Sequence, residues 1–483
     1  MNAKEFLNNV CKEIKYKPAN KPITEELEAH IEELKNENLC KGLSEEQAEQ
    51  NAVEQMGNPT KIGKKLNKIH KPKLDLITLI LTIILIFWGG GYAKLLYPNV
   101  FWDKGFLSLN DFITNEVEYI IYILVLLFSV FLYFYDYRKI CKHSKTLYIL
   151  ATTLNIIAYM RGFRANGNLI YGLWPFAAIS PSVFSIPLYI IAFSGFMKDI
   201  NKESKIKITI SKEKTINPNI IKIGILSIIS VITSLMINFV SGFLVATVYM
   251  IISIRELIKA QNKKNAIIFI GVSILLFSLL ATIICIIPLK WDMGDYYEPT
   301  SAYWVGVETK GEQRKDFLRG ELFKTAKLFG KADLSNTPIE NEYGYFYDIS
   351  RSFYPSGDFA LLGMISYYGW IPSLGFVGLL LLFSIKLIIN AIKMKDTYGK
   401  LLVIGISSLY IVQTVCNLLM NLGIIGIAEF NIPFISGGDA EWLVNILCMS
   451  LILSVYRRKD INFEQPKKSK LVASIENFFF EEC

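Results

Sequence analysis

An acidic residue, Asp358, directly precedes a long apolar run in the segment YPSGDFALLGMISYYGW, residues 354–370. A carboxylate beside hydrocarbon loses part of its hydration, which makes it a stronger base and suits it to accept a proton. Ionisable groups at such positions in membrane proteins are usually functional. The alternative is an acid at the start of an interfacial helix, where the helix dipole stabilises it. Composition alone favours this second interpretation.

A second group of candidate residues lies in IPFISGGDAEWLVN, residues 432–445. Its Pro-Phe-Ile-Ser-Gly-Gly sequence can bend the chain back and leave backbone amides exposed. The hydroxyl of Ser436 and the amides of Gly437 and Gly438 could then bind a phosphate or sugar oxygen. An ordinary glycine turn between two helices explains the same residues and is favoured when this segment is considered by itself.

Three amide side chains, those of Gln413, Asn417 and Asn421, recur every four residues in an apolar segment. Each step advances only about 40° around a helix, so the amides form one polar stripe. In hydrocarbon the stripe must face the bundle interior or a wet cavity. Substrate binding and hydrogen bonding between helices are equally compatible with it.

The segment RGELFKTAKLFGKADL, residues 319–334, is basic and amphipathic. On a helix, Lys324, Lys327 and Lys331 fall on related faces, with Leu322, Phe323 and Leu328 opposite. Such a helix could lie in the membrane interface and bring its cations to a lipid phosphate. A solvated charged face is the alternative, and it is favoured on this evidence alone.

The elements that must position these residues are membrane helices. Of the 483 residues, 52% are hydrophobic, and apolar runs long enough to span a bilayer recur. We predict an all-α fold, a polytopic helical bundle of about ten transmembrane helices in 75–456. The predicted spans are about 75–97, 118–136, 146–161, 172–197, 219–236, 238–254, 266–288, 358–386, 399–424 and 440–456.

The flanking charges predict the topology. Loops 137–145, 198–217, 255–265 and 393–400 carry most of the short-loop Lys and Arg, whereas 98–117 has one Lys and several acids. The positive-inside rule therefore predicts a multi-pass membrane protein with both termini cytoplasmic. The large loop 289–357 and Asp358 are then external, as are Arg161 and Arg164, which fit the rule least well.

Composition narrows the chemistry that this outer face can perform. The seven cysteines form no CxxC pair and none lies in 289–357, so neither a disulfide framework nor a thiolate metal site is predicted. The three histidines, His30, His70 and His143, fall on the cytoplasmic side, which leaves carboxylates, Lys, Arg, Tyr and hydroxyls outside. The net charge of +8 indicates basic loops facing anionic membrane lipid, with no nucleic-acid partner.

Residues 1–74 form a separate polar unit, and 457–483 form a basic cytoplasmic tail. Thr24 is a candidate N-cap of a first helix, Ser44 and Gln47 form a capping box before a second, and Gly57-Asn58-Pro59 precedes a third. This three-helix unit resembles the permease-prefix (HAAS-type) domains of Gram-positive bacteria. A helical tether and a regulatory domain are both compatible with it.

Over roughly 75–458 the chain resembles the SEDS family (shape, elongation, division and sporulation proteins of the FtsW/RodA/SpoVE type), which has ten spans. The matching residues are Gly357-Asp358-Phe359 with Gly369, Leu328-Phe329-Gly330-Lys331, Gln413 with Asn417, Asn421 and Gly423, the segment 433–438 with Asn445, the segment 179–184, and Arg457-Arg458. Some positions that are polar in the family differ here. They are Ser180, Val183, Ile186, Ser366 and Tyr367.

The resemblance implies a peptidoglycan glycosyltransferase that polymerises lipid II on the outer membrane face, in cell wall synthesis linked to division, shape or sporulation. Asp358 would be the catalytic carboxylate, and undecaprenyl pyrophosphate would leave. Lys327, Lys331 and Arg351 are the candidates for binding its diphosphate, alone or with a divalent cation (Mg²⁺ or Mn²⁺). A class B penicillin-binding protein is the implied partner. The alternatives are a flippase for a lipid-linked precursor and an inactive membrane sensor or scaffold.

Overall fold

The computed structural model of the chain contains two compact units. The first comprises Met1–Asp75, Met394–Asp396 and Tyr456–Cys483, and the second comprises Leu76–Lys393 and Thr397–Val455. The residues that the structure describes are 1–70, 75–96, 109–165, 168–170, 180–198, 208–211, 214–216, 218–259, 320, 322–332, 339–340, 346–347, 360–425, 430–435 and 438–459.

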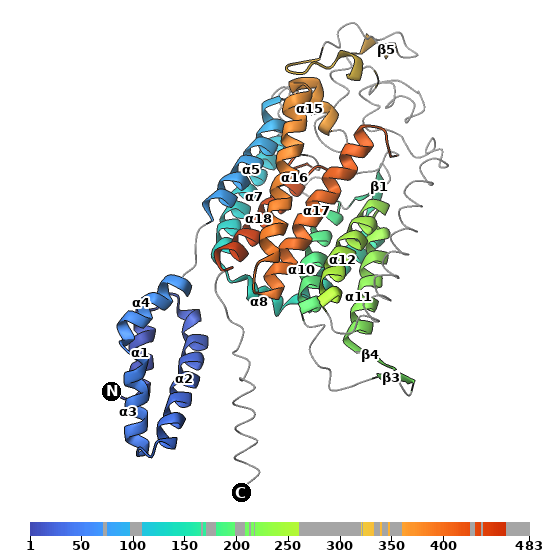
Figure 1. The fold of residues 1–483 in the computed structure, drawn as a ribbon. Coiled ribbons are helices and arrows are strands. Elements are labelled where there is room, and N and C mark those ends of the chain that lie inside the picture. The colour runs from blue at the N-terminus through green and yellow to red at the C-terminus, as the bar shows by residue number, and fades with distance from the viewer. Residues whose placement is uncertain are drawn as a thin grey trace. The chain divides into compact units, whose positions relative to one another are not determined.

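The first unit is built from four α-helices and one short 3-10 turn (Figure 1). They are α1 Ala3–Glu13, η1 Lys17–Ala19, α2 Asn20–Cys40, α3 Glu45–Met56 and α4 Pro59–His70. Two capping boxes begin helices, Asn2 with Glu5 at α1 and Ser44 with Gln47 at α3. The structure thus confirms the predicted cap at Ser44.

The prediction of three helices in this unit was wrong, because α1 had not been identified and α2 begins before Thr24. Pro22 lies in the first turn of α2, where a helix does not need the N–H that proline lacks. Thr24 is therefore inside the helix, and its hydroxyl lies 3.2 Å from the Cys11 thiol.

The first unit has a hydrophobic core of its own. Phe6, Val10 and Ala52 are fully buried, and their neighbours come from all four helices. The remaining members are Leu7, Ile14, Ala19, Ile23, Ile31 and Val53, with Leu27, Leu34, Met56, Ile62 and Leu66 packed around them. On the surface, Lys35 Nζ lies 2.8 Å from Glu45 Oε1, and this hydrogen bond raises the pKa of Lys35.

The second unit is a helical bundle, shown in Figure 1. Its α-helices are α5 Leu76–Leu96, α7 Leu109–Phe134, α8 Tyr137–Cys141, α9 Ser144–Arg161, α10 Ser182–Lys198, α11 Pro218–Leu235, α12 Phe239–Lys259, α15 Ala360–Tyr368, α16 Trp370–Ile392, α17 Thr397–Asn421 and α18 Gly438–Arg457. Three antiparallel hairpins are too short to change the fold class. They are β1 Phe163–Ala165 with β2 Asn168–Ile170, β3 Ile208–Ser211 with β4 Lys214–Ile216, and β5 Ile339–Glu340 with β6 Phe346–Tyr347.

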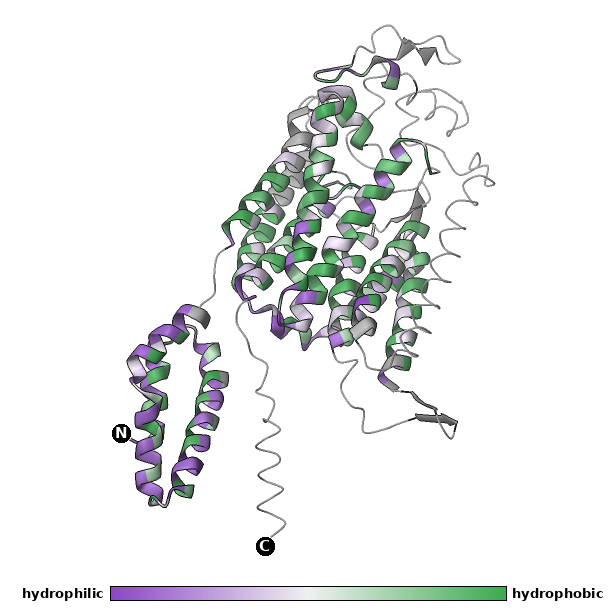
Figure 2. Ribbon diagram, viewed as in Figure 1, coloured by the Kyte–Doolittle hydropathy of each residue, from purple (hydrophilic) through white to green (hydrophobic). Residues whose placement is uncertain are grey.

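The predicted polytopic helical membrane fold is confirmed. Within the described residues, three helices have the length and hydropathy of a membrane span, Trp370–Ile392, Thr397–Asn421 and Ala440–Arg457. Shorter apolar helices accompany them, and Figure 2 shows hydrophobic residues along most of the bundle. Large side chains such as Phe87 and Leu127 are 75% and 63% exposed, which suits a surface in contact with lipid. The predicted span 266–288 lies outside the described residues.

Close helix packing around α17 depends on two of its glycines. α17 packs against α10, α12 and α16. A Cβ at Gly405 would lie 2.6 Å from Ile190 Cγ2, and one at Gly399 would lie 2.8 Å from Tyr137 Cε2. Larger residues at these two positions would therefore force the helices apart.

The predicted span 358–386 was wrong as a single helix. Gly369 has φ 90°, a conformation that L side chains rarely adopt, and it separates α15 from α16. A Cβ at Gly369 would lie 2.7 Å from the carbonyl oxygen of Lys327. A distant part of the chain therefore contacts the break directly.

Candidate functional site

The candidate catalytic residue, Asp358, precedes the helix α15 in the sequence. α15 begins at Ala360, two positions after Asp358. Asp358, Arg351, Ser436 and Gly437 lie outside the described residues, so their predicted roles stay predictions. The two described elements that adjoin them are the helix α15, and the turn 430–435 with Gly438 at the start of α18.

A segment that carries two predicted substrate-binding lysines is hydrogen-bonded to the break between α15 and α16. The amides of Trp370 and Ile371 donate to the carbonyls of Lys327 and Leu328, each at 3.0 Å. In return, the amides of Gly330 and Ala332 donate to the carbonyls of Tyr368 and Ser366, each at 2.8 Å. The backbone of 327–332 is thereby fixed at the C-terminal end of α15.

The prediction of one amphipathic helix over 319–334 was wrong for its described part. Only 322–325 is helical within 322–332, because 327–332 bonds to the break and not to itself. Leu322 is buried, whereas Leu328 and Phe329 are 65% and 64% exposed. The exposed apolar pair beside Lys327 and Lys331 has the composition of a loop at a membrane interface.

The side chain of Lys331 lies over an aromatic ring. Its Nζ is 5.9 Å from the ring centroid of Tyr367, which in turn packs edge-on against Tyr368 at 5.4 Å. A cation held in this way stays near the C-terminal end of α15. The helix rises about 12 Å from Ala360 to Tyr368. Lys331 is therefore about two helical turns away from the end of α15 that adjoins Asp358.

Two of the three residues in the amide stripe of α17 are buried and hydrogen-bonded. Asn421 Nδ2 donates to the carbonyl of Asn417 at 2.9 Å and to its Oδ1 at 2.8 Å. Asn417 Nδ2 donates to the carbonyl of Phe430. Gln413 is half-buried. These bonds attach the turn 430–435 to the end of α17, which favours the bundle-holding interpretation for the two asparagines.

The turn 430–435 contains a strained residue. Phe434 has φ 73°, although it is not a glycine, and its side chain is 1% exposed. The left-handed region costs such a residue about 1–2 kcal/mol. Its ring packs against Tyr410 with centroids 5.5 Å apart, and Phe430 packs against Phe243 at 5.9 Å. Burial of these rings compensates for the strain and fixes the backbone immediately before Ser436.

Glu441 is a further candidate that the sequence reasoning missed. Among the described residues it is the one Asp or Glu that is buried, with 7% of its surface exposed. Asn431 Nδ2 donates to Glu441 Oε2 at 2.7 Å, which joins the turn to the first turn of α18. An acid beside an apolar span was the observation that identified Asp358, and it applies equally to Glu441.

Its neighbour Trp442 links α18 to the N-terminal part of the bundle. The indole Nε1 donates to the carbonyl of Ile86 at 3.2 Å, and Tyr122 lies edge-on to the indole at 6.2 Å. The turn 430–435 is thus bonded to the end of α17 and to the first turn of α18, and Trp442 of α18 contacts α5 and α7. The polar residues around this turn are Asn431, Asn417, Asn421 and Glu441.

The described residues give no cluster of three or more His, Cys, Asp or Glu that could hold a metal ion. The described polar groups around this turn are amides and one carboxylate, which can form hydrogen bonds with sugar hydroxyls. The part of 289–357 that contains Arg351 lies outside the described residues.

Two positions where the chain differs from the SEDS pattern satisfy their own hydrogen bonds. Ser366 Oγ donates to the carbonyl of Gly363 at 2.8 Å, and the hydroxyls of Ser180 and Ser182 are 2.8 Å apart. Ile186 is buried within α10. These residues contribute packing and local bonds, so they do not replace the lost polar groups.

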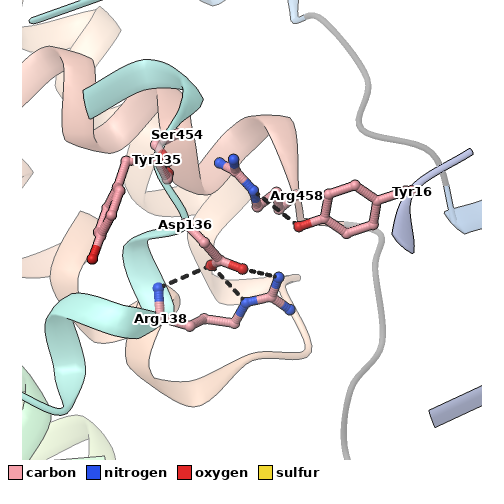
Figure 3. A network of polar contacts seen from close by, with 6 residues as sticks. All are labelled: Tyr16, Tyr135, Asp136, Arg138, Ser454 and Arg458. Atoms are coloured by element: carbon pink, nitrogen blue, oxygen red, sulfur yellow. Dashed lines mark hydrogen bonds and ion pairs between the residues drawn. The ribbon is translucent and has the colours of Figure 1, made fainter. Parts of the chain in front are cut away.

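Polar contacts at the junction of α7 and α8 are structural (Figure 3). Asp136 caps α8 by accepting from the amide of Arg138 at 3.1 Å, and it pairs with the Arg138 guanidinium at 2.7 Å. Ser454 Oγ donates to the carbonyl of Tyr135 at 2.6 Å, which ties α18 to the same corner. In the first unit, Arg458 Nε donates to the hydroxyl of Tyr16 at 3.4 Å.

Comparison with known proteins finds similarity in the C-terminal part of the chain. Residues 354–461 match the FtsW/RodA/SpoVE family model, which is described as a cell cycle protein. The probable peptidoglycan glycosyltransferase FtsW of Enterococcus hirae is 25% identical over 188 residues, 33% of this chain and 47% of that protein. Stage V sporulation protein E of Bacillus subtilis (strain 168) is 28% identical over 144 residues, 25% of this chain and 39% of that protein.

These alignments span less than half the length of either relative. The fold likeness extends further. A chain of a solved peptidoglycan synthase complex superimposes with a TM-score of 0.52 at 14% identity, covering 80% of this chain and 98% of that one. The matched segment includes Asp358, the amide stripe and the turn 430–435, so the chain is similar to the FtsW/RodA/SpoVE family over residues 354–461.

Proposed function

We propose that the chain is a peptidoglycan glycosyltransferase that polymerises lipid II in cell wall synthesis, during division, shape maintenance or sporulation. The observation that carries the proposal is the family match over 354–461, which contains Asp358, two positions before α15 in the sequence. The similarity to a relative named as a probable peptidoglycan glycosyltransferase supports the same reaction.

In the proposed reaction, Asp358 accepts the proton of the 4-hydroxyl of the acceptor sugar as its oxygen attacks the anomeric carbon of the donor. The bond from that carbon to the diphosphate oxygen breaks, and undecaprenyl pyrophosphate leaves with the bonding electrons. The products are a glycan longer by one unit and a proton on Asp358, which returns to solvent. A base placed in this way contributes about 10²–10⁴-fold to the rate.

The diphosphate leaving group carries charge that must be neutralised. Lys327 and Lys331 are held at the end of α15 by the backbone bonds of 327–332, and Arg351 lies in the same loop of the sequence. We assign these three cations to the diphosphate, alone or with Mg²⁺ or Mn²⁺. The fixed turn before Ser436, Gly437 and Gly438 supports a role for that segment in binding the sugar or phosphate oxygens.

The topology belongs to the same proposal. The basic short loops favour both termini in the cytoplasm, which leaves Asp358 and the turn 430–435 at the outer face of the plasma membrane. A class B penicillin-binding protein is the proposed partner, because it would supply the transpeptidase that crosslinks the glycan. The likeness in fold to a chain of a peptidoglycan synthase complex supports an assembly of this kind.

The test is polymerisation of labelled lipid II by the purified chain, with and without the candidate partner. We expect Asp358→Asn to lower the rate by at least about 10²-fold while binding of lipid II is retained. Asp396→Asn, in the first unit, is the control for removal of an acid and should leave the rate unchanged.

Two results would contradict the proposal. One is the absence of glycan from the wild-type chain under conditions in which an active family member makes it. The other is an unchanged rate in Asp358→Asn. Survival of precursor transport in that variant, with no polymerisation by the wild type, would instead indicate a flippase.

A further inference from the structure

Helix α4 carries a stripe of lysines on the side that faces away from its own domain. Lys61, Lys64, Lys65 and Lys68 are spaced i, i+3, i+4 and i+7, so they lie within an arc of about 100° around the helix. All four are exposed. The stripe is therefore a single basic surface and not a scatter of separate charges.

The opposite side of α4 explains why the stripe must face outward. Ile62 and Leu66 pack against the core of the first unit. Gly63 lies so close to α1 that a Cβ there would be 2.7 Å from the carbonyl oxygen of Val10. Helix α4 is thus fixed in rotation by its packing, and the lysines cannot turn toward the domain.

The charge of the stripe is not neutralised within the domain. None of the four lysines makes an ion pair with a residue that the structure describes. Residues 59–70 contain no acid, whereas residues 20–58 contain ten Glu and three Lys. The first unit therefore separates its charges, with the acids on α2 and α3 and an unpaired basic surface on α4.

The chain holds this basic surface near a bilayer. Helix α4 ends at His70 and the apolar helix α5 begins at Leu76. The five residues between them, KPKLD, add two more lysines. At no more than about 3.6 Å per residue, they let the end of α4 lie at most about 20 Å from the start of the first span.

We propose that the lysine stripe of α4 binds the anionic phospholipid headgroups of the leaflet from which α5 enters the membrane. Anionic lipid matches the charge of the stripe, it is within the reach of the linker, and it presents many phosphates to one helix face. Juxtamembrane lysines bind such a surface with a contribution of about 1 kcal/mol each, which is roughly fivefold in the binding constant. The proposal does not depend on glycosyltransferase activity.

The experiment measures acylation of individual lysines by mass spectrometry on the full chain in nanodiscs. One set of nanodiscs contains phosphatidylcholine alone, and the other adds phosphatidylglycerol. We expect Lys61, Lys64, Lys65 and Lys68 to become several-fold less reactive only in the anionic nanodiscs. Lys41, which is exposed just after α2, is the internal control and should react equally in both.

Salt and substitution then test the cause of the protection. Raising the salt from about 0.1 M to about 1 M shortens the Debye length from about 10 Å to about 3 Å, which should remove the protection. Lys61→Gln with Lys64→Gln should weaken protection of Lys65 and Lys68 by about fivefold for each charge removed. Lys12→Gln with Lys41→Gln is the matched control, since it removes the same charge elsewhere on the domain.

Equal reactivity of the α4 lysines in the two lipid compositions would overturn the proposal. So would a loss of reactivity at Lys41 as large as that at α4, because this would show general crowding at the membrane. Protection of the α4 lysines by a soluble polyanion such as RNA, without any effect of anionic lipid, would assign the surface to a different class of partner.

Discussion

Glu441 connects the turn before α18 to the helix itself through its 2.7 Å bond from Asn431. A carboxylate that is 7% exposed is stable only when its hydrogen bonds are made. The bond therefore fixes the start of the turn 430–435, where Asn417 also bonds to the carbonyl of Phe430. We regard Glu441 as a positioning residue for the proposed reaction.

We expect Glu441→Ala to lower the free energy of unfolding by about 2–3 kcal/mol, because it removes a charge-assisted hydrogen bond and leaves the Asn431 amide unpaired. Exchange of the backbone amides of 430–435 with deuterium should become faster, and polymerisation should slow through kcat more than through KM. Hydrogen-exchange mass spectrometry and steady-state kinetics measure the two effects.

Two substitutions, at residues 431 and 441, distinguish this positioning role from a general loss of stability. Asn431→Asp alone should be worse than Glu441→Ala, because it places two carboxylates side by side. Adding Glu441→Gln reverses the direction of the bond, with the amide of residue 441 donating to the acid at 431. The backbone amides of 430–435 should then exchange slowly again, and the polymerisation rate should recover. An equal defect in the double variant would refute a role through this bond.

At the level of elements, the break between α15 and α16 positions the lysines of 327–332. Gly369 at φ 90° makes the break, and the carbonyls of Lys327 and Leu328 occupy the space where a Cβ would project. We expect Gly369→Ala to destabilise the chain by about 2–4 kcal/mol through backbone strain and overpacking. Thermal unfolding in detergent measures the change, and lipid II binding should weaken with it.

Gly378→Ala in α16 is the matched control for that substitution. A Cβ at Gly378 meets no atom within 4 Å, and alanine is the better helix former. Stability should therefore be unchanged or rise by up to about 1 kcal/mol. If the two variants behaved alike, the break would not depend on the conformation of Gly369.

The same break shows where prediction from the sequence succeeds and where it fails. The ends of α9, α11, α17 and α18 lie within a few residues of the predicted spans, because long apolar runs with charged or glycine-rich ends determine them locally. The interruption at Gly369 could not be predicted, since it depends on hydrogen bonds to a segment about forty residues earlier. The helix expected over 319–334 failed for the same reason.

In the candidate site, too, local features could be predicted from the sequence and distant contacts could not. The amide stripe was predictable from its spacing, because periodicity alone places Asn417 and Asn421 on one face. The partner of that stripe, the carbonyl of Phe430, was not predictable, because it depends on a left-handed turn at Phe434. Glu441 could have been identified by the argument that was applied to Asp358.

At the scale of the whole molecule, the first unit and the proposed chemistry are separable. The core of the first unit is formed entirely by residues between Ala3 and Leu66, and the described candidate residues belong to the second unit. We therefore expect a chain that lacks residues 1–70 to polymerise lipid II at the wild-type rate when equal amounts of purified protein are compared. The hydrogen bond from Arg458 to Tyr16, which this deletion removes, can be replaced by water.

This deletion also discriminates between a tether and a regulatory domain. A tether predicts an unchanged rate and an unchanged thermal midpoint for the membrane bundle. A regulatory domain predicts a changed rate at an unchanged midpoint, and the change should depend on the phosphatidylglycerol content if α4 reports the lipid surface to the bundle. The rate and the thermal midpoint should therefore be measured at two phosphatidylglycerol contents. The Lys61→Gln/Lys64→Gln variant, which keeps the domain but lacks half of the stripe's charge, is measured beside the deletion. The comparison tests whether the charge on α4 acts on catalysis or only on the position of its own domain.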